Sequence, residues 1–151
     1  MAFLVSLLHK QNKTIMMTGF VHLHNLLRWV ILVLLIWSLI NSFSKKNGKE
    51  TRILTIVSHV MLLLGLVQWF MGDWGMKLIQ NAGMSNVMHD SMQRKMAVEH
   101  PIMMILSIVL ITMGGVFVKK GKDNAKWFYL IALIVILAGI PWFRPMMPGM
   151  H

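Results

Sequence analysis

Four long runs of apolar residues, separated by short polar segments, dominate the sequence. They cover residues 20–43, 53–71, 98–118 and 127–143. A helix rises ~1.5 Å per residue, so about 20 apolar residues cross the ~30 Å hydrocarbon core of a bilayer. Each run has that length or comes close to it. The pattern predicts an all-α membrane protein, a single domain whose four transmembrane helices form an up-down-up-down bundle.

Basic residues fill the short connections after the first and third runs. Residues 44–52 read Ser-Lys-Lys-Asn-Gly-Lys-Glu-Thr-Arg, and residues 119–126 read Lys-Lys-Gly-Lys-Asp-Asn-Ala-Lys. Short loops rich in Lys and Arg remain on the cytoplasmic side of a membrane. We therefore expect both termini outside, together with the longer connection 72–97, part of which should form an interfacial helix.

Composition narrows the classes of function. Of the residues, 56% are hydrophobic and 13% charged, and the formal net charge is +10. Because the basic residues lie in the connections rather than along one helix face, they indicate topology and not nucleic-acid binding. There are no cysteines, so any metal must be held by His, Met or carboxylate. The N-terminus lacks the basic start and cleavage pattern of a signal peptide, and Met17 offers an alternative start.

The ionisable side chains that we single out within the predicted spans are His24, Arg28, His59 and His100. Such residues are costly in a bilayer, so each is a functional candidate that should face the bundle interior. His22 and His24 point ~200° apart on a helix, so only one can face inward. His24 shares a face with Arg28, which favours His24 as the inward residue and leaves His22 at the interface.

His24 and His100 are predicted at similar depth near the outer side, on helices that lie diagonally in a four-helix bundle. Two imidazoles facing each other across an apolar slot suit the axial positions of a haem. The structural alternative is two boundary histidines that bind water. Arg28 favours haem, because its charge needs an anion: Glu99, Asp73, Asp90 or a haem propionate. Arg144 would serve a second propionate or act as an interfacial anchor.

His59 lies nearer the middle of the second run, where the fourth run offers no histidine to pair with it. Three interpretations remain open: a hydrogen bond between helices, a donor in a quinone site, or an alternative metal ligand. Gly65 in the same run would let a neighbouring helix or a flat ring approach closely.

Methionines suggest copper as an alternative metal. Met84, Met88, Met92 and Met96 recur at intervals of four ahead of His100, and residues 146–151 read Met-Met-Pro-Gly-Met-His. Thioether and imidazole ligands favour Cu(I). Methionine also fills gaps in apolar cores, and its abundance extends along the whole chain.

Three segments carry a resemblance to a known group of proteins. They are His-Leu-His-Asn-Leu-Leu-Arg-Trp at 22–29, Ser-His-Val-Met-Leu-Leu-Leu-Gly-Leu at 58–66 and Val-Glu-His-Pro-Ile-Met-Met at 98–104. On these residues the chain resembles small four-helix membrane proteins of Bacteroidota labelled cytochrome b. It is more distantly similar to one half of haem A synthase. That family places its ligands on the second and fourth helices of each half, so only the cofactor type carries over.

The resemblance implies haem b. We expect the chain in a bacterial inner membrane, and the basic connections predict both termini on the periplasmic side. Two protein ligands would leave iron no open position for a substrate, which favours electron transfer over catalysis. The partners expected are the lipid bilayer, a quinone, and a redox protein or a larger membrane complex. The competing class is a non-redox membrane subunit that handles copper or serves structure alone.

Overall fold

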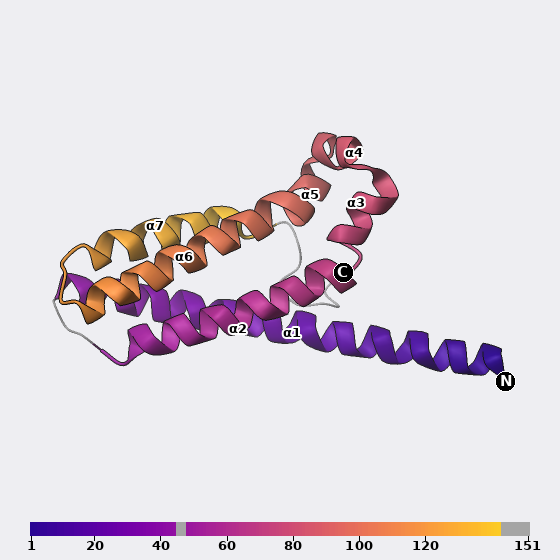
Figure 1. Ribbon diagram of the computed structural model, residues 1–151, viewed down its shortest axis with the longest axis horizontal. Helices are drawn as coiled ribbons and strands as arrows, with labels where there is room; N and C mark the ends of the chain where they lie inside the picture. Colours follow the sequence, from indigo (N-terminus) through magenta and orange to yellow (C-terminus); the bar gives the residue numbers. More distant parts are fainter. Residues whose placement is uncertain (45–47, 143–151) are drawn as a thin grey trace.

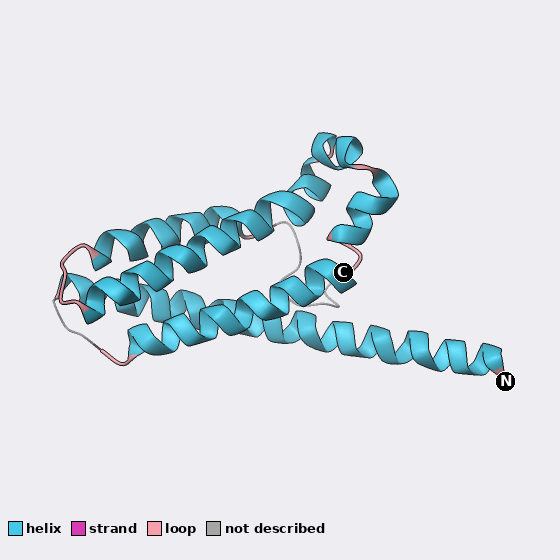
Figure 2. Ribbon diagram, viewed as in Figure 1, coloured by secondary structure: helices cyan, strands magenta, loops and turns pink. Residues whose placement is uncertain are grey.

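The computed structural model describes residues 1–44 and 48–142, and nearly all of these are helical (Figures 1 and 2). The four long helices are α1 (Ala2–Phe43), α2 (Glu50–Met71), α6 (His100–Lys119) and α7 (Ala125–Gly139). Short elements connect α2 to α6: α3 (Met76–Ala82), α4 (Met84–His89), α5 (Ser91–Arg94) and the π-helical turn η1 (Lys95–Glu99). The described part of the chain contains no strand, which confirms the predicted all-α class.

The long helices form an antiparallel bundle with a defined order of neighbours. Both α1 and α6 pack against α2 and α7, so α1 lies diagonally opposite α6 (Figure 1). We call the end where α2 finishes and α6 begins the histidine end, because it contains His24 and His100. The opposite end, where α2 begins and α6 finishes, is the basic end, with Arg52 and Lys119.

Three helical segments are long and apolar enough to cross a membrane: Ser6–Phe43, Glu50–Ala82 and Ser91–Lys119. The fourth, α7, is apolar but has 15 residues. The outer surface of the bundle carries large, exposed apolar side chains, among them Ile36, Ile56, Leu63, Val109 and Ile134. Such a surface is compatible with contact to a lipid bilayer.

The first helix begins much earlier than the apolar run predicts. It starts at Ala2 rather than at residue 20, and the added turns project beyond the end of α2 (Figure 1). The polar residues ahead of the first apolar run, His-Lys-Gln-Asn-Lys-Thr at 9–14, include no proline. A helix continues through such residues as long as nothing breaks it. With 42 residues, α1 is ~63 Å long, about twice the thickness of a bilayer core.

The fourth helix is shorter than predicted. It ends at Gly139, and Ile140 is extended with φ −65° and ψ 129°. Pro141 follows, and the residue before a proline is disfavoured in the helical conformation. The predicted end at residue 143 lies outside the described residues. The third span also differs from the predicted start at residue 98. Helical structure runs on through α5, η1 and α6, from Ser91 to Lys119, and α6 itself begins at His100.

Side chains fill the bundle unevenly along its length. Buried residues from all four long helices form a core towards the basic end, including Leu35, Leu54, Ile111, Tyr129 and Ala132. Towards the histidine end the interior opens into a cavity of about 1080 Å³. Two hydrogen bonds tie its rim: Gln68 Nε2 donates to the Phe20 carbonyl and Trp69 Nε1 to that of Ala97, both at 2.9 Å. The fold is therefore packed at one end and hollow at the other.

Close packing of α6 on α7 depends on Gly114. A Cβ at this position would lie 2.6 Å from Cε1 of the buried Tyr129 ring. We expect Gly114→Ala to cost about 1–3 kcal/mol through overpacking and to lower the thermal unfolding midpoint in detergent by several degrees, as followed by circular dichroism. Gly19→Ala is the matched control, since no atom lies within 4 Å of its added Cβ. Equal midpoints for the two variants would contradict this account.

Candidate functional site

His24 of α1 and His100 of α6 face each other across the bundle diagonal. Their ring centroids are 6.3 Å apart and their planes meet at 66°. The structure thus brings together the two histidines that the sequence nominates as a pair. In the described residues, neither His24 nitrogen nor His100 Nε2 has a hydrogen-bond partner.

The His100 ring is oriented by the last turn of α7. Its Nδ1 lies 3.0 Å from the carbonyl oxygen of Gly139. A carbonyl only accepts, so Nδ1 carries the proton and a neutral ring has its lone pair on Nε2. A backbone carbonyl bound to one imidazole nitrogen commonly fixes the tautomer that leaves the other nitrogen as a metal ligand.

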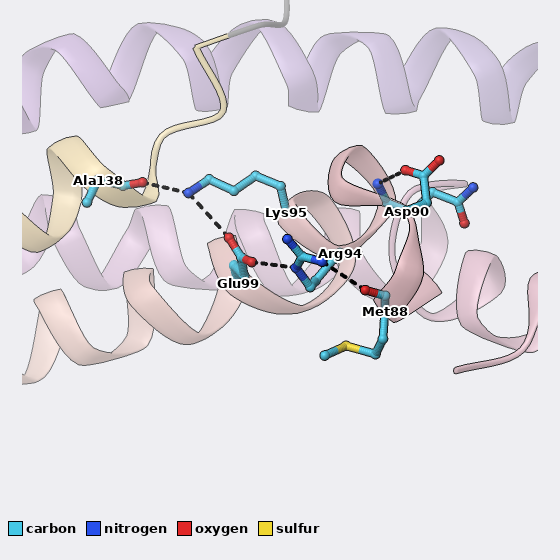
Figure 3. A network of polar contacts seen from close by, with 7 residues as sticks. Met88, Asp90, Arg94, Lys95, Glu99 and Ala138 are labelled. Carbon is cyan, nitrogen blue, oxygen red and sulfur yellow. Dashed lines mark hydrogen bonds and ion pairs between the residues drawn. The ribbon is translucent and has the colours of Figure 1, made fainter. Parts of the chain in front are cut away.

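A polar network holds the backbone just before His100 (Figure 3). Lys95 Nζ donates to the Ala138 carbonyl at 2.6 Å and lies 3.6 Å from a Glu99 carboxylate oxygen. Arg94 Nε donates to the other Glu99 oxygen at 2.8 Å. The π-helical turn η1 carries Lys95 and Glu99 directly ahead of His100. Side chains from η1 and α6 thus satisfy two C-terminal carbonyls of α7, which would otherwise lack donors.

The His24 ring lies against Gly65 of α2. A Cβ added at Gly65 would be 3.5 Å from His24 Cε1, which is ordinary van der Waals contact. The flat ring that Gly65 admits is therefore the imidazole of His24. His24 Nδ1 is buried without a partner, and a buried polar atom of this kind calls for a ligand or an ordered water.

Both imidazoles line the cavity of about 1080 Å³, a volume slightly above the ~300–1,000 Å³ typical of ligand sites. Its wall is mostly apolar and draws on all four long helices. Besides the two histidines, its polar or aromatic lining residues include Asn25, Arg28, Ser58, Gln68 and Trp69, with Asp73, Trp74 and Lys77 also lining it. The hydroxyl of Ser58 is also buried without a partner. The cavity therefore suits a large, largely apolar ligand with a few polar groups.

Arg28 brings a cation into this cavity without an anion to meet it. Its Nε and Nη2 atoms are buried and have no hydrogen-bond partner. The guanidinium lies 5.6 Å from the centroid of the exposed Trp29 ring, which is its one described favourable contact. Side chains on a helix lean towards the N-terminus, so Arg28 reaches back towards the level of His24.

None of the carboxylates that the sequence offers to Arg28 is bound to it. Glu99 pairs with Arg94 and Lys95, Asp73 with Lys77 at 3.2 Å, and Asp90 accepts the Gln93 backbone N–H. The two remaining acidic residues of the chain, Glu50 and Asp123, lie at the basic end. No carboxylate of the described residues is bound to Arg28, so its anion must come from a ligand.

The other candidate residues lie apart from this pair. His22 is exposed on α1, as its predicted place at the interface requires. His59 is exposed on α2 and does not line the cavity; its Nδ1 donates to the Thr55 carbonyl of its own helix at 2.8 Å. The structure therefore places His59 neither in a hydrogen bond between helices nor beside the pair of His24 and His100. Arg144 lies outside the described residues.

The methionine series does not form one continuous stripe. Met84 and Met88 lie on α4, Met92 on α5 and Met96 on η1, with an extended residue, Asp90, between α4 and α5. Asp90 breaks the helix because its carboxylate caps the start of α5. Met84, Met88 and Met92 are exposed. In the described ranges no three His, Asp or Glu side chains gather around a metal position either. The residues at 146–151 lie outside these ranges.

Sequence reasoning missed three contributors to the site. The carbonyls of Ala138 and Gly139 carry no sequence signal, because any residue supplies one. The sequence does show Lys95 four residues ahead of Glu99, a spacing typical of a helical ion pair, but not the contact of Lys95 with α7. Comparisons of the chain with protein-family models, with curated proteins and with solved structures find no match, so the site is interpreted from its own geometry.

Proposed function

We propose that the protein is a membrane b-type cytochrome that binds one haem b between His24 and His100 and transfers electrons. The proposal agrees with the resemblance to four-helix proteins labelled cytochrome b. It is carried by one observation: two imidazoles with centroids 6.3 Å apart, each with an unpartnered ring nitrogen, that open onto one large, mostly apolar cavity.

The separation of the rings suits a single metal held between them. With metal–imidazole bonds of ~2.0–2.1 Å and ring nitrogens roughly 1.1 Å from the ring centre, two axial imidazoles have centroids ~6 Å apart. The buried atoms without hydrogen-bond partners give the cavity an imidazole nitrogen of His24 that can bind a metal and the cationic guanidinium of Arg28.

Each side chain has a distinct task in this proposal. His24 and His100 would hold the group from opposite sides, with Gly139 fixing the proton of His100 on Nδ1. Arg28 would bind a propionate through its Nε and Nη2 donors, which match a carboxylate in a bidentate pair. Bound haem supplies reversible one-electron chemistry, and its potential depends on the axial ligands and their surroundings.

Electron transfer is favoured over catalysis because two protein ligands leave no open coordination position. The electron partners are then a quinone or a redox protein, and the chain would work alone or as a subunit of a larger complex. Copper handling gains no support from the described residues, where the methionines are dispersed over three short elements.

The orientation follows from charge. Four crossings by α1, α2, α6 and α7 would place the basic end, with Arg52, Lys119, Lys120 and Lys126, in the cytoplasm. The histidine end and both termini would then face the periplasm across a bacterial inner membrane. With 15 residues, α7 is shorter than the about 20 that a full crossing takes.

An absorption spectrum tests the proposal. The full chain, purified from a membrane extract of cells supplied with a haem precursor, is expected to show a Soret band and, after dithionite, a sharp α-band of low-spin haem. A pyridine haemochrome assay would give close to one haem per chain. Protein that shows no such bands, before or after added haemin, would rule the proposal out.

A further inference from the structure

His59 is an exposed histidine in the middle of a membrane-length helix. It lies nine residues after Glu50 begins α2, ~14 Å along the axis. Its side chain points away from the bundle cavity and towards the surface that lipid would cover. Its Nδ1 is hydrogen-bonded within the helix, but an Nε2 atom that faces hydrocarbon without a partner is costly, so its position calls for a ligand.

The hydrogen bond of His59 defines what that ligand must offer. Nδ1 donates to the Thr55 carbonyl at 2.8 Å, so a neutral ring presents its Nε2 lone pair outward. This atom accepts a hydrogen bond and does not donate one. The donor role that the sequence suggested for His59 is therefore reversed in this tautomer.

A groove between α2 and α6 lies beside His59. Its volume is about 270 Å³, and His59 lines it together with Leu62, Ile105, Ile108, Val109, Thr112 and Met113. The Thr112 hydroxyl donates to the Ile108 carbonyl at 2.7 Å, so its oxygen is left to accept as well. The groove is apolar apart from these two acceptors, and its volume suits a ring-sized head group.

Only one layer of side chains separates this groove from the cavity that holds His24 and His100. Leu62, Ile105 and Ile108 line both spaces. A ring bound in the groove would therefore lie within a few residues of the proposed haem, with apolar contacts between the two and no backbone layer to cross.

We infer that the groove binds the head group of a membrane quinol, whose O–H donates to His59 Nε2. A quinol is apolar enough to reach the groove through the bilayer, carries hydroxyl donors for the two acceptors, and would lie next to the electron carrier. The role of the quinol as an electron partner rests on the proposed function, but the groove and its two acceptors do not depend on haem.

Binding of a fluorescent quinol analogue tests the inference. The probe is 2-heptyl-4-hydroxyquinoline N-oxide, titrated into the full chain in phosphatidylcholine nanodiscs, with empty nanodiscs subtracted. We expect saturable binding at one site per chain. His59→Leu should weaken it about tenfold, the effect of one lost hydrogen bond in an apolar setting. His59→Gln, which keeps an acceptor oxygen, should stay within about threefold.

His89→Leu is the matched control. His89 is also exposed and also donates through Nδ1 to the carbonyl four residues earlier, that of Ser85 at 2.7 Å, but it lies on α4 outside the groove. Its loss should leave binding unchanged. Equal affinity of His59→Leu and the unaltered protein for the probe would overturn the inference. A protein that is dimeric in nanodiscs and fails to bind the probe would also overturn it, because a second copy would then occupy the groove.

The same titration in a haem-free His24→Ala variant separates the two proposals. Binding that persists there and still depends on His59 supports the quinol site whatever the spectrum shows. A chain with haem bands but no saturable binding would leave the cytochrome proposal standing and remove this inference.

Discussion

Replacing His100 by alanine is expected to lower haem content at least about tenfold. The variant removes one of the two proposed haem ligands, and even the loss of a group that only orients a metal ligand costs ~10–100-fold in affinity. It also frees the Gly139 carbonyl that His100 binds at 3.0 Å. The ratio of Soret to protein absorbance, measured at equal expression, reports the change. His24→Ala should act in the same way.

Added imidazole distinguishes a lost ligand from a lost fold. The deleted ring leaves a space of its own size, so millimolar imidazole should restore part of the low-spin spectrum in His100→Ala and His24→Ala. His22→Ala is the control, since His22 is exposed on the same helix as His24. Full haem in His100→Ala would show that the ligand assignment is wrong, while the bundle itself would remain unaffected.

The helices were the part of the fold that sequence could predict. Apolar runs locate α1, α2, α6 and α7 because a helix in lipid must be apolar over most of its length. Their ends were less predictable. The start of α1 at Ala2 depends on the absence of a helix breaker, which an apolar pattern does not register, whereas the early end of α7 follows from Pro141 and was present in the sequence.

For the site, one kind of signal was available and another was not. Ionisable residues within apolar runs identified His24, Arg28 and His100, and the structure places all three on the cavity. The partners of the acids were not predictable. Glu99 looks available to Arg28 in sequence, but the π-helical turn directs it to Arg94 and Lys95 (Figure 3). A π turn shifts side chains around the helix by an amount that periodicity does not anticipate.

His59 shows why depth alone could not assign a role. Its place along α2 follows from counting residues, whereas the direction of its ring depends on which face of α2 meets α6 and α1. Apolar residues before and after His59 lie on every face of the helix, so no amphipathic pattern shows which face packs against the other helices. Only the packed bundle shows that His59 faces outward while Gly65 faces the His24 ring.

Arg28 offers a test in which haem binding and folding should respond in opposite directions. Its Nε and Nη2 atoms are buried without hydrogen-bond partners in the described residues, and replacing a buried charge that no opposite charge compensates is often neutral or stabilising. Arg28→Leu should therefore leave the unfolding midpoint of the haem-free protein unchanged or raise it. Haem affinity should fall about tenfold to a hundredfold, the effect of a charged hydrogen bond worth ~1.5–3 kcal/mol.

Arg28→Lys refines this test, because lysine keeps the charge and loses the planar pair of donors. Its haem affinity should fall between those of the unaltered protein and Arg28→Leu, as measured by haemin titration of the haem-free chains. If Arg28→Leu instead lowers the unfolding midpoint and binds haem as before, Arg28 stabilises the bundle. The anion it lacks in the described residues would then not be a propionate. If Arg28 instead proves necessary for haem binding but not for folding, the cavity, the guanidinium and the cofactor belong to one site.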